Sequence, residues 1–220
     1  MLSNKLITLV IAVVILFIPF LCKDSAIYYF VMEKFGVHKR DIVIDRVEET
    51  KDVLPATRKV FMSAREKLAS LTGVQMTDLE RKYKILREEY RFCKKSGEKI
   101  TEEIKEIKKA SEALFREWQE ELELYHDKRM QAFSREQLYR TKECYQEMLD
   151  CMYTAESCMQ TVLKTLQDRI LLCKHNLNAR TIGSLESKVA DIQNKISHLI
   201  REMDTAIEKT DTFLAEMEKV

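Results

Sequence analysis

The chain has few residues that make tight turns. Among its 220 residues there are only four glycines and two prolines, and these two residue types supply most turn geometry. A fold with many short strands is therefore excluded. A third of the residues are charged, and charge at this level combined with few turn residues is typical of long helices.

The chain also has almost no net charge. Lys and Arg total 37 against 36 for Asp and Glu, which leaves +1 at neutral pH. No global field draws such a protein to nucleic acid. The basic pairs Lys94-Lys95 and Lys108-Lys109 have no interleaved exposed aromatic residues, so the sequence predicts no nucleic-acid partner.

The motifs of common enzyme classes are absent from the sequence. None of the four glycines lies in a P-loop, and there is no dinucleotide fingerprint, HExxH or G-x-S-x-G. The four histidines, His38, His126, His175 and His198, have no metal-ligand spacing. We therefore expect no catalytic residues, no cofactor and no enzymatic activity.

One apolar run stands apart from the rest of the chain. Residues 6–21 are apolar except for Thr8, and Lys5 and Lys23 flank them. About 18 or more apolar residues are usual for a spanning helix, and a basic start before a short apolar run also fits a secretory signal. We interpret residues 1–22 as a signal peptide or membrane anchor and residues 23–38 as a short linker or helix.

The remaining residues, 39–220, carry four helical stripes. Apolar residues recur in alternating steps of four and three, the 3.5-residue repeat of a left-handed supercoil. The sequence predicts helices over about 39–72, 77–126, 134–176 and 181–218. In the second, the inward positions are Tyr83, Leu86, Tyr90, Cys93, Gly97, Ile100, Ile104, Ile107, Ser111, Leu114 and Trp118, followed after a stutter by Leu122 and Tyr125.

Local signals suggest where these helices begin and end. Residues 77–80 and 134–137 are capping boxes, Gly73 is a natural stop, and Pro55 should kink the first helix. The third helix is expected to break near residues 176–178, where the repeat loosens. Because the connections are short, neighbouring helices should be antiparallel. The predicted fold is all-α, an elongated antiparallel bundle or a hairpin of hairpins.

Three cysteines in the third helix are the main candidates for binding chemistry. Cys144, Cys151 and Cys158 are spaced by seven and share one face with methionines, and thiolate and thioether ligands favour copper(I). Residues seven apart are separated by about 10.5 Å along a helix, so one metal needs a partner helix as well. The simpler interpretation is that small, soft side chains fill a helix–helix contact. A disulfide from Cys93 to one of the three is possible in an oxidising compartment.

Four segments of the chain form a distinctive set: residues 38–49, 113–122, 174–180, which read KHNLNAR, and 199–203. Together they resemble a known bacterial family, the domain of unknown function twenty-nine fifty-nine. The resemblance covers about residues 25–217, and KHNLNAR is its most specific part. It implies export and a lipoprotein-type cysteine shortly before a Tyr-Tyr pair, which here would make Cys22, ahead of Tyr28-Tyr29, the lipid anchor. The family signal has a small residue where this chain has Leu21, so an uncleaved anchor remains the alternative.

KHNLNAR also has a physical interpretation of its own. Asn176 and Asn178 can cap backbone groups where two helices meet, and Lys174 and His175 suit the negative end of a helix. This predicts a structural elbow. The alternative is a docking point for a partner, with Arg180 as its anchor.

Together these features predict a membrane-anchored protein of the bacterial cell envelope that faces the periplasm. Its helices would act as a scaffold or protein-interaction surface, through a protein partner or self-association. One alternative is a binding module for a small ligand or soft metal on the Cys/Met face. Another is a cytoplasmic-facing coiled coil on an uncleaved anchor.

Overall fold

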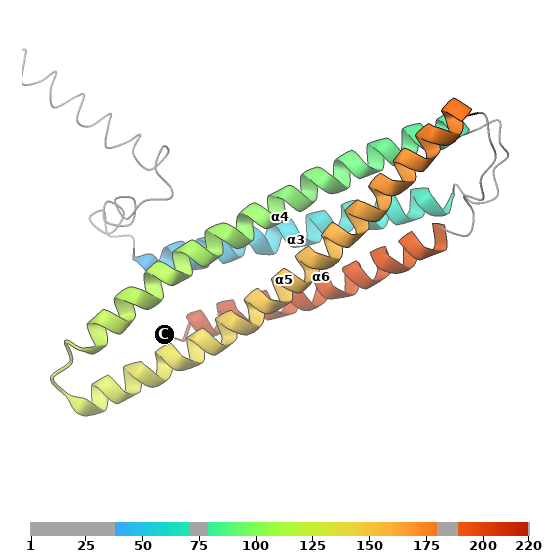
Figure 1. Cartoon of the computed structure of the whole chain (residues 1–220). Helices are drawn as coiled ribbons and strands as arrows, with labels where there is room; N and C mark the ends of the chain where they lie inside the picture. Colours follow the sequence, from blue (N-terminus) through green and yellow to red (C-terminus); the bar gives the residue numbers. More distant parts are fainter. Residues whose placement is uncertain (1–37, 71–78, 180–188, 220) are drawn as a thin grey trace, which may run out of the picture.

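The computed structural model describes residues 38–70, 79–179 and 189–219 (Figure 1). Four predicted features lie outside these residues: the anchor with Cys22, the helix stop at Gly73, the first residues of the 77–80 capping box, and Arg180. Within the described residues, no helix is both long and apolar enough to cross a membrane.

The described residues form four helices in an antiparallel bundle. They are α3 (Lys39–Ala69), α4 (Leu79–Leu122), α5 (Lys128–Ala179) and α6 (Val189–Met217). Each helix packs against two others, in the order α3, α4, α5, α6 and back to α3 (Figure 1). The predicted all-α class with about four long helices is confirmed, and the arrangement is a closed bundle.

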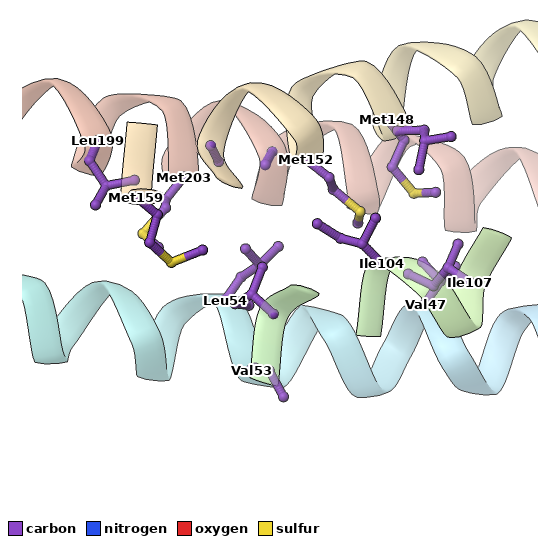
Figure 2. Close-up of a cluster of buried hydrophobic side chains, with 14 of the residues drawn as sticks. Val47, Val53, Leu54, Ile104, Ile107, Met148, Met152, Met159, Leu199 and Met203 are labelled. Carbon is purple, nitrogen blue, oxygen red and sulfur yellow. The ribbon is translucent and has the colours of Figure 1, made fainter. Parts of the chain in front are cut away.

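One apolar core fills the bundle along its length. The predicted repeat positions point into it from all four helices, as Figure 2 shows for Leu54 of α3, Ile107 of α4, Met152 of α5 and Met203 of α6. Burying a large apolar side chain stabilises a protein by about 1.5–3 kcal/mol, so this strip supplies most of the packing energy. Fully buried repeat positions include Val43, Val47, Phe61, Ile100, Ile107, Met148, Met159, Leu166, Ile196, Leu199 and Phe213.

Ion pairs between helices lie around this core. Lys67 of α3 binds Glu89 of α4 at 2.6 Å, and Lys209 of α6 binds Glu147 of α5 at 2.7 Å. The Lys209–Glu147 pair is exposed, and exposed pairs contribute about 0–1 kcal/mol each, whereas the Glu89 carboxylate of the other pair is buried. The ion pairs therefore help to align neighbouring helices along the bundle, whereas the apolar core supplies most of its stability.

The turn between α4 and α5 differs from the prediction. α5 begins at Lys128, and the carboxylate of Asp127 accepts from the Arg129 amide at 2.7 Å as the helix cap. The predicted capping box at 134–137 is wrong, because Ser134 lies inside the helix and its hydroxyl accepts from the Trp118 indole at 2.9 Å. An N-cap signature is local, and Asp127 provides an earlier cap.

Two further expectations need correction. α5 does not break at residues 176–178 but continues to Ala179, three residues past its predicted end at about 176. The repeat itself also continues, since Cys173 is fully buried. Tyr125, predicted to face inward, is 38 % exposed beyond the end of α4. α3 continues past Pro55, and a kink there stays a prediction.

Both described chain ends lie at the end of the bundle that holds the α4–α5 turn, which we call the proximal end. Lys39, the first residue of α3, forms an ion pair with Glu117 of α4. Arg40 Nε donates to the carbonyl of Met217 at 3.2 Å, where a cation suits the negative end of α6. In Figure 1 the α4–α5 turn extends past both of these helix ends.

Gly97 is a point of close approach between α4 and α5. A Cβ at this position would lie 3.3 Å from Met159 Sδ and 3.5 Å from Leu163 Cδ1. The thioether is the flexible end of a side chain and can shift by a few tenths of an ångström. A methyl group therefore fits here, whereas a larger side chain meets the packed face of α5.

We predict that Gly97→Ala raises the free energy of unfolding by up to about 1 kcal/mol, because Ala has the higher helix propensity. Gly97→Leu should lower it by about 1–3 kcal/mol through overpacking. Urea unfolding of the full chain, followed by helical circular dichroism, measures both changes. A Leu variant as stable as the unmodified protein would contradict the close α4–α5 contact.

Candidate functional site

The three predicted cysteines lie along the contact between α5 and α6. Cys144, Cys151 and Cys158 are each partly buried and free. Glu216 of α6 lies near Cys144, and Glu202 of α6 acts on both Cys151 and Cys158. The three thiols thus lie in a row beside the methionine core, in line with their interpretation as small side chains in a helix contact.

Burial raises the pKa of these thiols. The pKa of Cys144, Cys151 and Cys158 lies above the usual value. Burial raises the pKa of Cys93 to about 12, and Cys93 is free. Because the thiolate is the form that attacks electrophiles and binds metals, these shifts lower the reactivity of the thiols.

A metal site on this face also needs ligands that converge. Among the described residues, no group of three or more His, Cys, Asp or Glu side chains could hold a metal ion. The three cysteines belong to one helix and are separated by two turns each. The soft-metal alternative therefore has no supporting observation in this part of the chain.

The KHNLNAR segment is only partly described. Lys174 and His175 are exposed near the end of α5. Asn176 and Asn178 lie in the helix backbone, and Arg180 lies outside the described residues. These positions test neither the elbow nor the docking interpretation. They show only that the helix continues through residue 179.

A groove between α4 and α5 was not predicted. It encloses about 630 Å³ near the end of the bundle opposite the α4–α5 turn, which we call the distal end. Tyr90 and Gln167 link its two sides, with 3.5 Å between the hydroxyl and the amide oxygen. The groove is lined by Tyr83, Lys84, Arg87, Glu88, Tyr90, Arg91, Lys94, Gln167, Ile170 and Leu171.

The groove combines an apolar floor with a basic rim. Arg87 and Arg91 are one helical turn apart and make no ion pair within the described residues, although Arg91 lies 5.1 Å over the Phe92 ring. Lys84 and Lys94 pair with Glu80 and Glu98 on α4. Leu171 leaves 46 % of its surface exposed at the opposite wall.

Sequence reasoning missed this groove although a signal was present. Aromatic residues at 83, 90 and 92 alternate with basic residues at 84, 87, 91 and 94. The tyrosines were assigned to the core because they occupy repeat positions. They are only partly buried, since the α4–α5 contact at this end leaves one side of each ring open to the groove.

We predict a fixed order of cysteine alkylation in the folded full chain near pH 8. Cys144, Cys151 and Cys158 should react first but slowly, because burial raises the pKa of each thiol. Cys93 and Cys173, both fully buried, should react only as the bundle opens. Mass spectrometry of iodoacetamide-treated protein measures the order, and a guanidinium-unfolded control should react evenly. Early alkylation of Cys93 would contradict the packing.

Comparison with known proteins places the chain in a family without assigning a role. Neither the curated proteins nor the solved structures include a match to it. A family model described as "Protein of unknown function (DUF2959)" matches residues 28–217, which includes all four described helices. The chain therefore belongs to the DUF2959 family.

Proposed function

We propose that the protein is a membrane-anchored component of the bacterial cell envelope whose bundle is a rigid spacer and protein-interaction surface. The observation that carries this proposal is the single apolar core that joins four long helices with both described chain ends at the proximal end. A rod held at one end presents its other end at a distance.

The dimensions of the helices favour a spacer. At a rise of about 1.5 Å per residue, the 52 residues of α5 extend about 78 Å. Helices in globular proteins average about 10–14 residues. Such length adds reach and lateral surface. The balanced surface charge supports solvation of the rod in an aqueous compartment, which we take to be the periplasm.

The α4–α5 groove supports an interaction role at the distal end. Its apolar lining, together with Arg87 and Arg91, which form no ion pair within the described residues, suits an amphipathic helix with acidic residues, because such a helix buries apolar side chains and pairs with the rim. Glu80 and Glu98 neutralise Lys84 and Lys94, so the positive charge of the rim comes from Arg87 and Arg91 against Glu88. We assign the partner to this chemical class.

The anchor is tested by fractionation and by analysis of the N-terminus. We predict that the full chain remains with membranes after carbonate washing and is released by detergent. Labelled fatty acid should enter the protein and be lost in Cys22→Ala but kept in Cys144→Ala. Mass spectrometry distinguishes an acylated Cys22 from an intact Met1, which would identify an uncleaved anchor. Recovery of the protein in the soluble cytoplasm would reject the proposal.

The groove is tested by crosslinking in intact cells. We predict that a photoreactive amino acid at Leu171 forms a discrete protein adduct. The double change Arg87→Glu with Arg91→Glu should strongly reduce this adduct, because it reverses the charge of the rim. Arg116→Glu, a matched change on the exposed surface of α4, should leave it unaffected. Equal loss in both variants, or no adduct at all, would contradict docking at the groove.

A further inference from the structure

Exposed apolar side chains concentrate at the proximal turn of the bundle. Leu124, Tyr125, Met130 and Phe133 are 72 %, 38 %, 57 % and 64 % exposed. They are half of the eight exposed large apolar side chains that the structure records, and they lie within ten consecutive residues. We call these four residues the hairpin tip.

The backbone that presents the hairpin tip is held in place. Gln131 Nε2 donates to the carbonyl of Leu122 at 2.8 Å and is buried, which satisfies one of the free carbonyls at the end of α4. Asp127 caps α5 through the Arg129 amide. The apolar side chains therefore project from an ordered turn.

Among the described helices, neither α3 nor α6 extends over the hairpin tip. α3 begins level with Glu117 through the Lys39 ion pair, and α6 ends level with α3 through Arg40. α4 continues five residues past Glu117, or about 8 Å. Met130 and Phe133 lie three residues apart on one face of α5. The α4–α5 hairpin thus projects past the four-helix core with apolar residues exposed.

The chain that precedes α3 indicates what covers this surface. Residues 22–37 separate the apolar run at 6–21 from the start of the described bundle. Sixteen residues reach at most about 58 Å at 3.6 Å each, and they start from the same end of the rod as the hairpin tip. A bilayer that holds the apolar run is therefore within reach of the hairpin tip.

We propose that the hairpin tip is a second membrane contact, in which Leu124, Tyr125, Met130 and Phe133 enter the interface of the bilayer that the N-terminal segment anchors. This inference rests on the proposed function. Two contacts then fix the angle of the rod, whereas a linker alone would let it swing.

The composition of the tip suits the lipid interface. Tyrosine is enriched at the headgroup level of membranes, and leucine and phenylalanine enter the acyl boundary. Around the tip, the four carboxylates of Glu120, Glu121, Glu123 and Asp127 outnumber the cations Lys128 and Arg129, so charge does not attract the tip to anionic lipid. The contact is therefore apolar, and we expect it to depend little on salt or on the fraction of anionic lipid.

Tryptophan fluorescence tests this contact in the full chain. Trp118 is the only tryptophan, so the Trp118→Phe variant has no tryptophan emission. A single new tryptophan can then be placed at either of two positions. Phe133→Trp reports the hairpin tip, and Phe92→Trp is the matched control, 46 % exposed on α4 and about 39 Å along the helix from residue 118. Each is reconstituted in phosphatidylcholine–phosphatidylglycerol vesicles that contain brominated acyl chains.

The expected result is a blue shift and loss of most emission at residue 133, with emission at residue 92 unchanged. Leu124→Trp in the same background should behave like Phe133→Trp, and helical circular dichroism confirms that each variant folds. Unquenched emission at residues 133 and 124 in vesicle-bound protein would overturn the contact. So would a blue shift that depends on protein concentration without bromine quenching, which would indicate a second copy of the chain.

Vesicle flotation of the same samples tests the anchor separately. If the chain does not float with vesicles, the membrane anchor of the proposed function fails. If it floats and residue 133 is not quenched, the anchor stands and the tip contact fails. A raised salt concentration, or vesicles without phosphatidylglycerol, should leave the quenching at residue 133 in place.

Discussion

The structure depends on one requirement: four helices must bury their apolar stripes against one another at the same time. None of the helices can cover its own stripe, and long isolated helices are marginal in water. The stripes repeat every 3.5 residues, so each continues along its helix instead of spiralling around it. The result is a narrow core as long as the helices, in which Met152, Met203 and Phe61 are fully or almost fully buried. Ion pairs between helices, such as Lys67–Glu89, add to a bundle that this core already defines.

The two ends of the bundle differ from each other. The start of α3, the end of α6 and the α4–α5 turn share the proximal end, while the groove with Arg87 and Arg91 lies toward the distal end. The features available for binding are thus on the surface and near the ends. The interior is occupied by packed side chains, and the buried thiols are among them, with pKa values raised by desolvation.

Much of the core could be predicted because the repeat is strong. Buried positions on α4, such as Ile100, Ile104 and Ile107, follow the predicted steps. The errors lie at helix ends. Ser134 carried a good capping signature, yet Asp127 caps α5, because any residue with a suitable side chain can cap and the choice depends on where the chain must turn. Tyr125 was assigned inward by continuing a repeat past the residue where α4 ends.

The sequence by itself determined that the chain forms long helices, which face of each is buried, and that each helix needs partners. Periodicity determines these properties because it belongs to a single helix and is written in consecutive residues. Only the tertiary structure decided that α3 and α6 stop before the α4–α5 turn, which leaves Leu124 and Phe133 uncovered, and that Tyr83 and Tyr90 border a groove with Leu171. Exposure at such places depends on where the neighbouring helices begin and end, and no stretch of one helix records that.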